Sequence, residues 1–178
     1  MSFLELLGLK GRDSDPASAD PSLEAIARRL GNLPRDRALL VAAFAAVLVR
    51  AARADLHVSQ EETERMVSIV RELGGLSDDD AALVVEMATH DALTRGASQE
   101  YLATRELKRL ASEEERRRLL HCLFAVCAAD DSISIEEEQE VRQVASELGF
   151  ELRDYTEARS AFREQREVLR GLPEAPKP

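Results

Sequence analysis

The chain has 178 residues, of which 44% are hydrophobic, 33% are charged and 4% are aromatic. This length is typical of one domain, and the balance of apolar and charged residues excludes a disordered chain. The formal net charge of −10 excludes nucleic acid as the expected partner, because a phosphate backbone requires a basic surface. Cations, basic proteins and basic peptides fit this charge better.

The apolar segments indicate a cytoplasmic protein. The longest uninterrupted apolar run, residues 38–49, is too short to span a bilayer and suits a buried helix. The N-terminus lacks a basic region and a small-residue cleavage site, so we expect no signal peptide. Cys122 and Cys127 lie five residues apart in one apolar segment, where helix geometry opposes a mutual disulfide. Two free thiols are typical of a reducing compartment.

The N-terminal region divides into an apolar peptide, residues 1–10, and a linker of Gly, Asp, Ser, Ala and Pro, residues 11–21. The peptide predicts a short amphipathic helix, with Ser2 and Glu5 at capping-box spacing. Two interpretations stay open: the peptide folds back on the domain, or it docks onto a partner or, less favoured, a membrane surface. The second interpretation assigns the contact to Phe3, Leu4, Leu6 and Leu7.

Helical periodicity and helix caps dominate the rest of the chain. Helices are expected over about residues 23–30, 36–54, 60–73, 78–94, 98–111, 113–129, 135–148 and 152–170. N-terminal caps are expected at Ser59 with Glu62, Ser77 with Asp80, Ser112 with Glu115, and Ser134 with Glu137. We therefore predict an all-α, single-domain bundle of about seven to eight helices over residues 22–171, followed by a Pro-rich tail, residues 172–178.

An internal repeat organises this bundle. A shift of 75 positions aligns residues 54–74 with residues 129–149 and gives eight identities in 21 positions without a gap. The identical pairs are Ala54/Ala129, Asp55/Asp130, Ser59/Ser134, Glu61/Glu136, Glu62/Glu137, Glu72/Glu147, Leu73/Leu148 and Gly74/Gly149. We predict two pseudo-twofold related halves of three helices each, with the apolar central helices packed together.

The acidic loops that follow the two central helices have two interpretations, which can hold together. Ca²⁺, Mg²⁺ and Mn²⁺ prefer carboxylate and carbonyl oxygens, so the loops are candidate sites for a divalent cation. The candidate ligands are Asp55, Glu61, Glu62, Asp130, Glu136 and Glu137. Their spacing departs from the EF-hand loop. In the structural interpretation Ser59 and Ser134 cap the next helices, and the acidic residues complement the helix dipoles.

The repeated pattern is an apolar helix that ends in Ala-Asp and leads to Ser-x-Glu-Glu. In this pattern the chain resembles the TerB-like family of tellurite-resistance proteins. The resemblance covers about residues 35–166. It implies a helical fold, a role in tellurite and stress resistance, and a cation site at Asp55, Glu62, Asp130 and Glu137. The family pattern has Gly after the Asp, whereas this chain has Leu56 and Asp131, which weakens a ligand role for the backbone carbonyls there.

These observations predict a non-enzymatic, cytoplasmic stress-response and interaction module of the TerB-like type, whose acidic loops bind a divalent cation. The alternative is an adaptor that docks onto a larger assembly through its N-terminal peptide, with loops that only cap helices. We expect no catalysis, because the chain carries no phosphate-binding Gly-rich loop, no HExxH motif and no nucleophile elbow. The expected partner is a protein rather than nucleic acid or a membrane, and the chain is compatible with a monomer or a homodimer.

Overall fold

The computed structural model describes residues 21–51, 60–90, 100–130 and 132–163, without the side chains of 21–23, 51, 61–62, 100–102 and 130. This part of the chain forms eight α-helices and one 3₁₀ turn, which confirms the all-α prediction. The elements are α2 (Pro21–Gly31), α3 (Arg35–Ala51), α4 (Gln60–Glu72), α5 (Asp78–Thr89), α7 (Glu100–Leu110), α8 (Glu113–Cys127), η3 (Ala128–Asp130), α9 (Ile135–Glu147) and α10 (Leu152–Ser160). None of these helices is long and apolar enough to cross a membrane.

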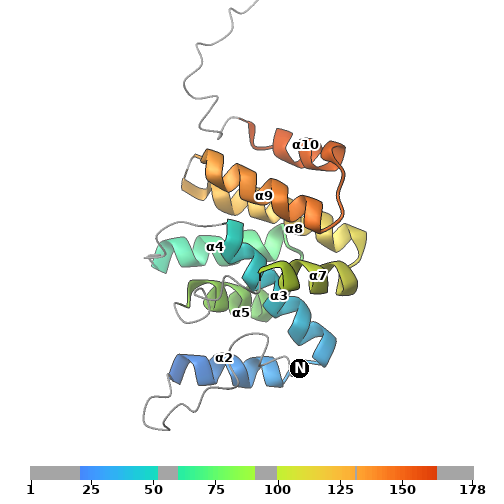
Figure 1. The fold of residues 1–178 in the computed structure, drawn as a ribbon. Coiled ribbons are helices and arrows are strands. Elements are labelled where there is room, and N and C mark those ends of the chain that lie inside the picture. Colours follow the sequence, from blue (N-terminus) through green and yellow to red (C-terminus); the bar gives the residue numbers. More distant parts are fainter. Residues whose placement is uncertain (1–20, 52–59, 91–99, 131, 164–178) are drawn as a thin grey trace, which may run out of the picture.

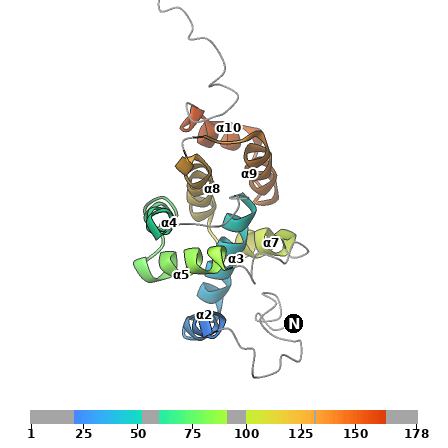
Figure 2. The same cartoon turned by 90° about the vertical axis from the view of Figure 1, so that its left-hand side faces the viewer.

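Helix α3 lies at the centre of the bundle, in contact with α2, α5, α7, α8 and α9 (Figure 1). Helices α4 and α7 lie on opposite sides of α3, while α2 and α10 lie at opposite ends of the molecule (Figure 2). The contact between α3 and α8 confirms the predicted pairing of the two central helices. The amphipathic helix of each half also packs on the central helix of the other half, α9 on α3 and α4 on α8.

The core is built mainly from Leu, Val and Ala, as expected from a chain with few aromatic residues. Its largest fully buried side chains are Phe124, Ile26, Leu30, Leu48, Leu107, Leu119, Leu120, Leu123, Ile133 and Leu148. Phe124 on α8 contacts the rings of Tyr155 and Phe162, with centroid distances of 5.6 and 5.9 Å. Cys122 and Cys127 are buried and form no disulfide, as predicted, and burial raises the pKa of the Cys122 thiol to about 12. A thiol with this pKa stays protonated and unreactive.

The repeat extends through the amphipathic helices and then shifts by one residue. Both ends of α4 and α9 are separated by 75 positions. Beyond them, the left-handed conformation is adopted by Gly75 (φ 67°) in the first half and by Gly149 (φ 88°) in the second, a separation of 74. Gly149 and Phe150 close α9 with backbone bonds to Ser146 and Ala145, the Schellman pattern. In the first half, one more residue therefore stands between the end of its amphipathic helix and the left-handed glycine than in the second half.

Following this shift, Asp80 of α5 and Asp154 of α10 occupy equivalent positions three residues after the N-caps Ser77 and Glu151. Each aspartate pairs with an arginine of a central helix. Arg37 Nη2 lies 2.5 Å from Asp80 Oδ2, and Arg117 Nη1 lies 2.9 Å from Asp154 Oδ1. These pairs attach the third helix of each half to α3 or α8.

Three predicted helix ends were wrong. Helix α5 ends at Thr89 rather than at residue 94, with His90 extended and the Thr89 hydroxyl donating to Val85 O. Helix α8 ends at Cys127, where the chain tightens into η3. Helix α10 ends at Ser160, before a turn that brings Phe162 onto Phe124. The expected continuations over residues 91–94 and 164–170 lie outside the described residues.

Candidate functional site

The second acidic loop connects α8 to α9 through η3. Ile133 in this loop is fully buried, so it anchors the chain just before the N-terminus of α9. Glu136, Glu137 and Glu138 occupy the first turn of α9, where the helix dipole favours negative charge.

Ser134 and Glu137 form the predicted capping box. Glu137 Oε2 accepts hydrogen bonds from the backbone N–H of Ser134 at 2.8 Å and from its hydroxyl at 2.9 Å. The backbone N–H of Glu137 donates to Ser134 Oγ at 3.1 Å. Ser112 and Glu115 form the same box at the start of α8, and the hydroxyl and backbone of Ser112 lower the pKa of Glu115. These bonds confirm the prediction that Glu137 closes a capping box with Ser134 at the start of α9.

The other two glutamates of this turn differ from Glu137. Glu136 is exposed to solvent. Glu138 forms an ion pair with Arg159 of α10 and accepts a hydrogen bond from the Tyr155 hydroxyl on its backbone oxygen at 3.3 Å. Glu136 is thus the glutamate of this turn most accessible to a cation, whereas Glu138 holds α10 against α9.

The predicted cation ligands are only partly described. In the part of the chain with described side chains, no three His, Cys, Asp or Glu residues converge as a metal site would require. Glu137 could offer Oε1, because its Oε2 already accepts two bonds from Ser134. Asp55 and the side chains of Glu61, Glu62 and Asp130 lie outside the described residues, as do Phe3, Leu4, Leu6 and Leu7. Cation binding and N-terminal docking therefore stay predictions.

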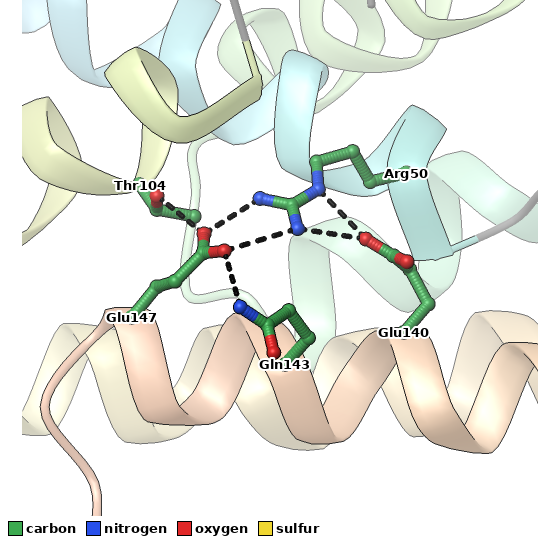
Figure 3. A network of polar contacts seen from close by, with 5 residues as sticks. All are labelled: Arg50, Thr104, Glu140, Gln143 and Glu147. Atoms are coloured by element: carbon green, nitrogen blue, oxygen red, sulfur yellow. Dashed lines mark hydrogen bonds and ion pairs between the residues drawn. The ribbon is translucent and has the colours of Figure 1, made fainter.

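A buried ionic network lies between the two halves (Figure 3). Arg50, in the last turn of α3, is 5% exposed, and its guanidinium lies between two glutamates of α9. Arg50 Nε and Nη2 lie 2.8 and 2.7 Å from Glu140 Oε1, and Nη1 lies 2.7 Å from Glu147 Oε2. Glu147 also accepts from the Thr104 hydroxyl of α7 at 2.7 Å and from the Gln143 amide at 3.0 Å. The network thus joins α3, α7 and α9.

The hydrogen bonds determine the charge state of this network. Burial raises the pKa of Glu147, but the donors Arg50, Thr104 and Gln143 outweigh burial and hold that pKa below its ordinary value. Burial lowers the pKa of Arg50, and its bonds to Glu147 and Glu140 raise that pKa overall. Arg50 and Glu147 are therefore charged at neutral pH, and neither is poised to transfer a proton.

The sequence did not predict this network. Arg50 stands at the end of an otherwise apolar segment, and its partner Glu147 is 97 residues away. The lone arginine that follows the apolar run could have indicated a buried ion pair, because a charge in a buried helix requires partners. The sequence alone could not identify which carboxylates these are.

Residues 41–160, about two thirds of the chain, match the family described as tellurite resistance protein TerB. The chain belongs to the TerB family. The match begins within α3, includes both acidic loops and ends where α10 ends, so α2 lies outside it. No curated protein and no solved structure matches the chain. Family membership confirms the resemblance seen in the repeated pattern and the helical bundle that it implied.

Proposed function

We propose that this protein is a non-enzymatic TerB-family module that acts in a stress response, and that its acidic loops bind a divalent cation. Membership of a tellurite-resistance family supports the physiological part of this proposal. The exposed Glu136, on a helix N-terminus fixed by the Ser134–Glu137 box, supports the second part. A hard cation such as Ca²⁺, Mg²⁺ or Mn²⁺ suits an all-oxygen ligand set of this kind.

The repeat supports a paired arrangement of such sites. Asp55, Glu61 and Glu62 occupy the same repeat positions as Asp130, Glu136 and Glu137, and each set follows one of two central helices that are in contact. The chain's net charge of −10 lowers the electrostatic cost of bringing a cation to this surface. A bound cation would in turn offset repulsion among the acidic residues.

Thermal unfolding in the presence of each cation tests the proposal. The wild type is compared with the double variant Asp55→Asn/Asp130→Asn in Ca²⁺, Mg²⁺, Mn²⁺, Zn²⁺ or chelator. A cation present at 100 times its dissociation constant adds about 2.7 kcal/mol to the free energy of unfolding. We expect a rise in Tm with one or more hard cations, and the loss of that rise in the double variant.

A matched control separates cation binding from a general effect of acidic charge. Asp36→Asn/Asp79→Asn removes two exposed carboxylates, also from helix first turns, outside the acidic loops. This variant should keep the full cation response. A Tm that no cation changes, or a response lost equally in both double variants, would contradict cation binding by the loops and favour an adaptor role instead.

A further inference from the structure

An apolar stripe on α4 is less well covered than the same stripe on α9. The stripe consists of Met66, Ile69 and Leu73, which lie three and four positions apart and so share one helical face. Met66 and Ile69 are partly buried, and Leu73 is 40% exposed. The residues at the same repeat positions of the second half are all fully buried, namely Val141, Val144 and Leu148. The α4 stripe therefore offers apolar surface to a further neighbour.

Helix α7 covers α9 in a way that is not matched on α4. It packs on α3 and α9, and its Thr104 donates to Glu147 (Figure 3). The helix that precedes α3 as α7 precedes α8 is α2, but α2 packs on α3 and α5 instead. In the described part of the chain, the helices that pack most closely on α4 are α5 and α8. The place that α7 takes on α9 therefore has no equivalent helix on α4 among the described residues.

The segment of residues 164–172, the C-terminal segment, has the sequence of such a helix. Val168, Leu169 and Leu172 would share one face of a helix. Residues 166–170 read Arg-Glu-Val-Leu-Arg, close to Arg-Glu-Leu-Lys-Arg at residues 105–109 of α7. Val168 aligns with Leu107, which is 1% exposed. A helix this short is marginal on its own, so it requires an apolar surface.

The end of the described chain lies beside α8, the helix on which α4 packs. Helix α10 ends at Ser160, and the turn that follows stacks Phe162 on Phe124 of α8 with 5.9 Å between ring centroids. Residues 164–178 can extend over about 50 Å. Helix α8 is only about 22 Å long. The C-terminal segment is thus long enough to reach the contact between α8 and α4.

We propose that the C-terminal segment forms a helix that docks on the α4 stripe, in the place that α7 takes on α9. Its own chain is the favoured occupant, because this segment leaves the domain next to α8 and repeats the pattern of α7. The entropy lost in ordering the segment offsets most of the gain from burying Val168 and Leu169, so the docking is reversible. The proposal is independent of cation binding by the acidic loops.

Thiol labelling of the full chain tests this docking. Cys122 and Cys127 are buried, so Leu73→Cys supplies the reactive thiol on the stripe. Adding Val168→Asp/Leu169→Asp should raise its alkylation rate about fivefold, because carboxylates on the segment oppose burial against an apolar stripe. The matched control Arg166→Gln/Arg170→Gln changes the polar side of the same segment and should leave the rate unchanged.

A second thiol separates docking from a general change in reactivity. Leu152→Cys replaces an exposed leucine of α10, and its alkylation rate should be the same with and without the aspartates. Circular dichroism verifies that each variant is folded. A rate at position 73 that the aspartates leave unchanged overturns the proposal. Protection lost in Phe3→Asp/Leu7→Asp instead would identify the N-terminal peptide as the occupant, and protection that grows with protein concentration would identify a second copy; either result also overturns it.

A disulfide provides a positional measurement. Oxidation of Leu73→Cys/Leu169→Cys should link the two positions within one chain, which keeps the mass of 19.7 kDa without reductant. Leu73→Cys/Lys177→Cys is the matched control, because Lys177 lies beyond the proposed helix, and it should form the link several times more slowly. Equal rates for the two pairs would show that the segment meets α4 only by random encounter, and would overturn the proposal.

Discussion

Glu72 and Glu147 occupy the same position of the repeat, at the last residues of α4 and α9, and differ in surroundings. The Glu147 side chain is 13% exposed and belongs to the network with Arg50 of the other half. The Glu72 side chain is 63% exposed and pairs with its neighbour Arg71 and with Ser68 on its own helix. The same residue at the same repeat position therefore lies in a buried network in the second half and at the surface in the first.

The difference originates on the partner helix. Helix α9 packs on α3, where Arg50 is available, and α4 packs on α8, where the residue at the repeat position of Arg50 is Ala125. Packing next to these glutamates differs as well: Leu148 is 0% exposed, whereas Leu73 is 40% exposed. Local sequence identity thus does not preserve an environment when the residue across the interface has changed.

The largest expected effect comes from removing Arg50. Arg50→Ala leaves Glu140 and Glu147 half-buried without their cation, so we expect a loss of about 3 to 5 kcal/mol in the free energy of unfolding. Urea denaturation measures this loss. Arg71→Ala is the matched control in the first half, and it should leave the urea midpoint unchanged because Arg71 is exposed.

A charge-free replacement sharpens this result. Arg50→Met/Glu140→Leu/Glu147→Met removes all three charges together and should recover most of the stability lost in Arg50→Ala. Recovery would show that the cost arises from uncompensated carboxylates. If the triple variant were as unstable as Arg50→Ala, the bonds to Thr104 and Gln143 would carry more of the stabilisation than the charges do.

The next effect in size concerns the leucines beside the two glutamates. Leu148→Ala creates a cavity in the core and should cost about 2 to 5 kcal/mol. Leu73→Ala removes a half-exposed side chain and should cost below about 1 kcal/mol. Equal losses in the two urea titrations would mean that α4 is covered as fully as α9, contrary to the comparison of the two halves.

The sequence predicted the features that depend on near neighbours. The boxes at Ser112 and Ser134, the cap at Ser77 and the helix stop at Gly149 each involve residues three to five positions apart. The repeat also predicted the matching bounds of α4 and α9. These features follow from backbone geometry, which a short segment already contains.

Features set by distant partners were missed. Arg116 donates to the backbone oxygen of Leu148, and the guanidinium groups of Arg116 and Arg117 lie over the Phe150 ring at 5.6 and 5.5 Å. The sequence did not predict these contacts. The Arg50 network and the early end of α10 likewise depend on residues elsewhere in the chain. The acidic ligand set was predicted from carboxylate chemistry and from the family resemblance, and only Glu136 and Glu137 of it have described side chains.

A smaller effect tests whether both amphipathic helices start in the same way. Ser134→Ala removes the hydroxyl that accepts from Glu137 N, at a cost of about 1 kcal/mol. The repeat predicts a similar cost for Ser59→Ala, because Ser59 precedes α4 as Ser134 precedes α9. Urea titrations of the two variants compare the caps directly. A Ser59→Ala chain as stable as the wild type would show that α4 begins without a side-chain cap.

The smallest effect is the acid dependence of stability. The pKa of Glu147 is lowered in the folded chain, so the unfolded chain binds a proton first as the pH falls below the ordinary glutamate value of about 4.3. The stability contributed by this carboxylate is complete above that value and is lost as the pH falls through the folded-state pKa. Glu147→Gln should therefore flatten the fall in the urea midpoint between about pH 5 and pH 3.

Glu72 also has a lowered pKa, because of Arg71 and Ser68, but its exposed pair is screened by salt. Repeating the titrations in about 1 M salt should abolish the contribution of Glu72 and keep most of that of Glu147, because buried pairs are screened far less.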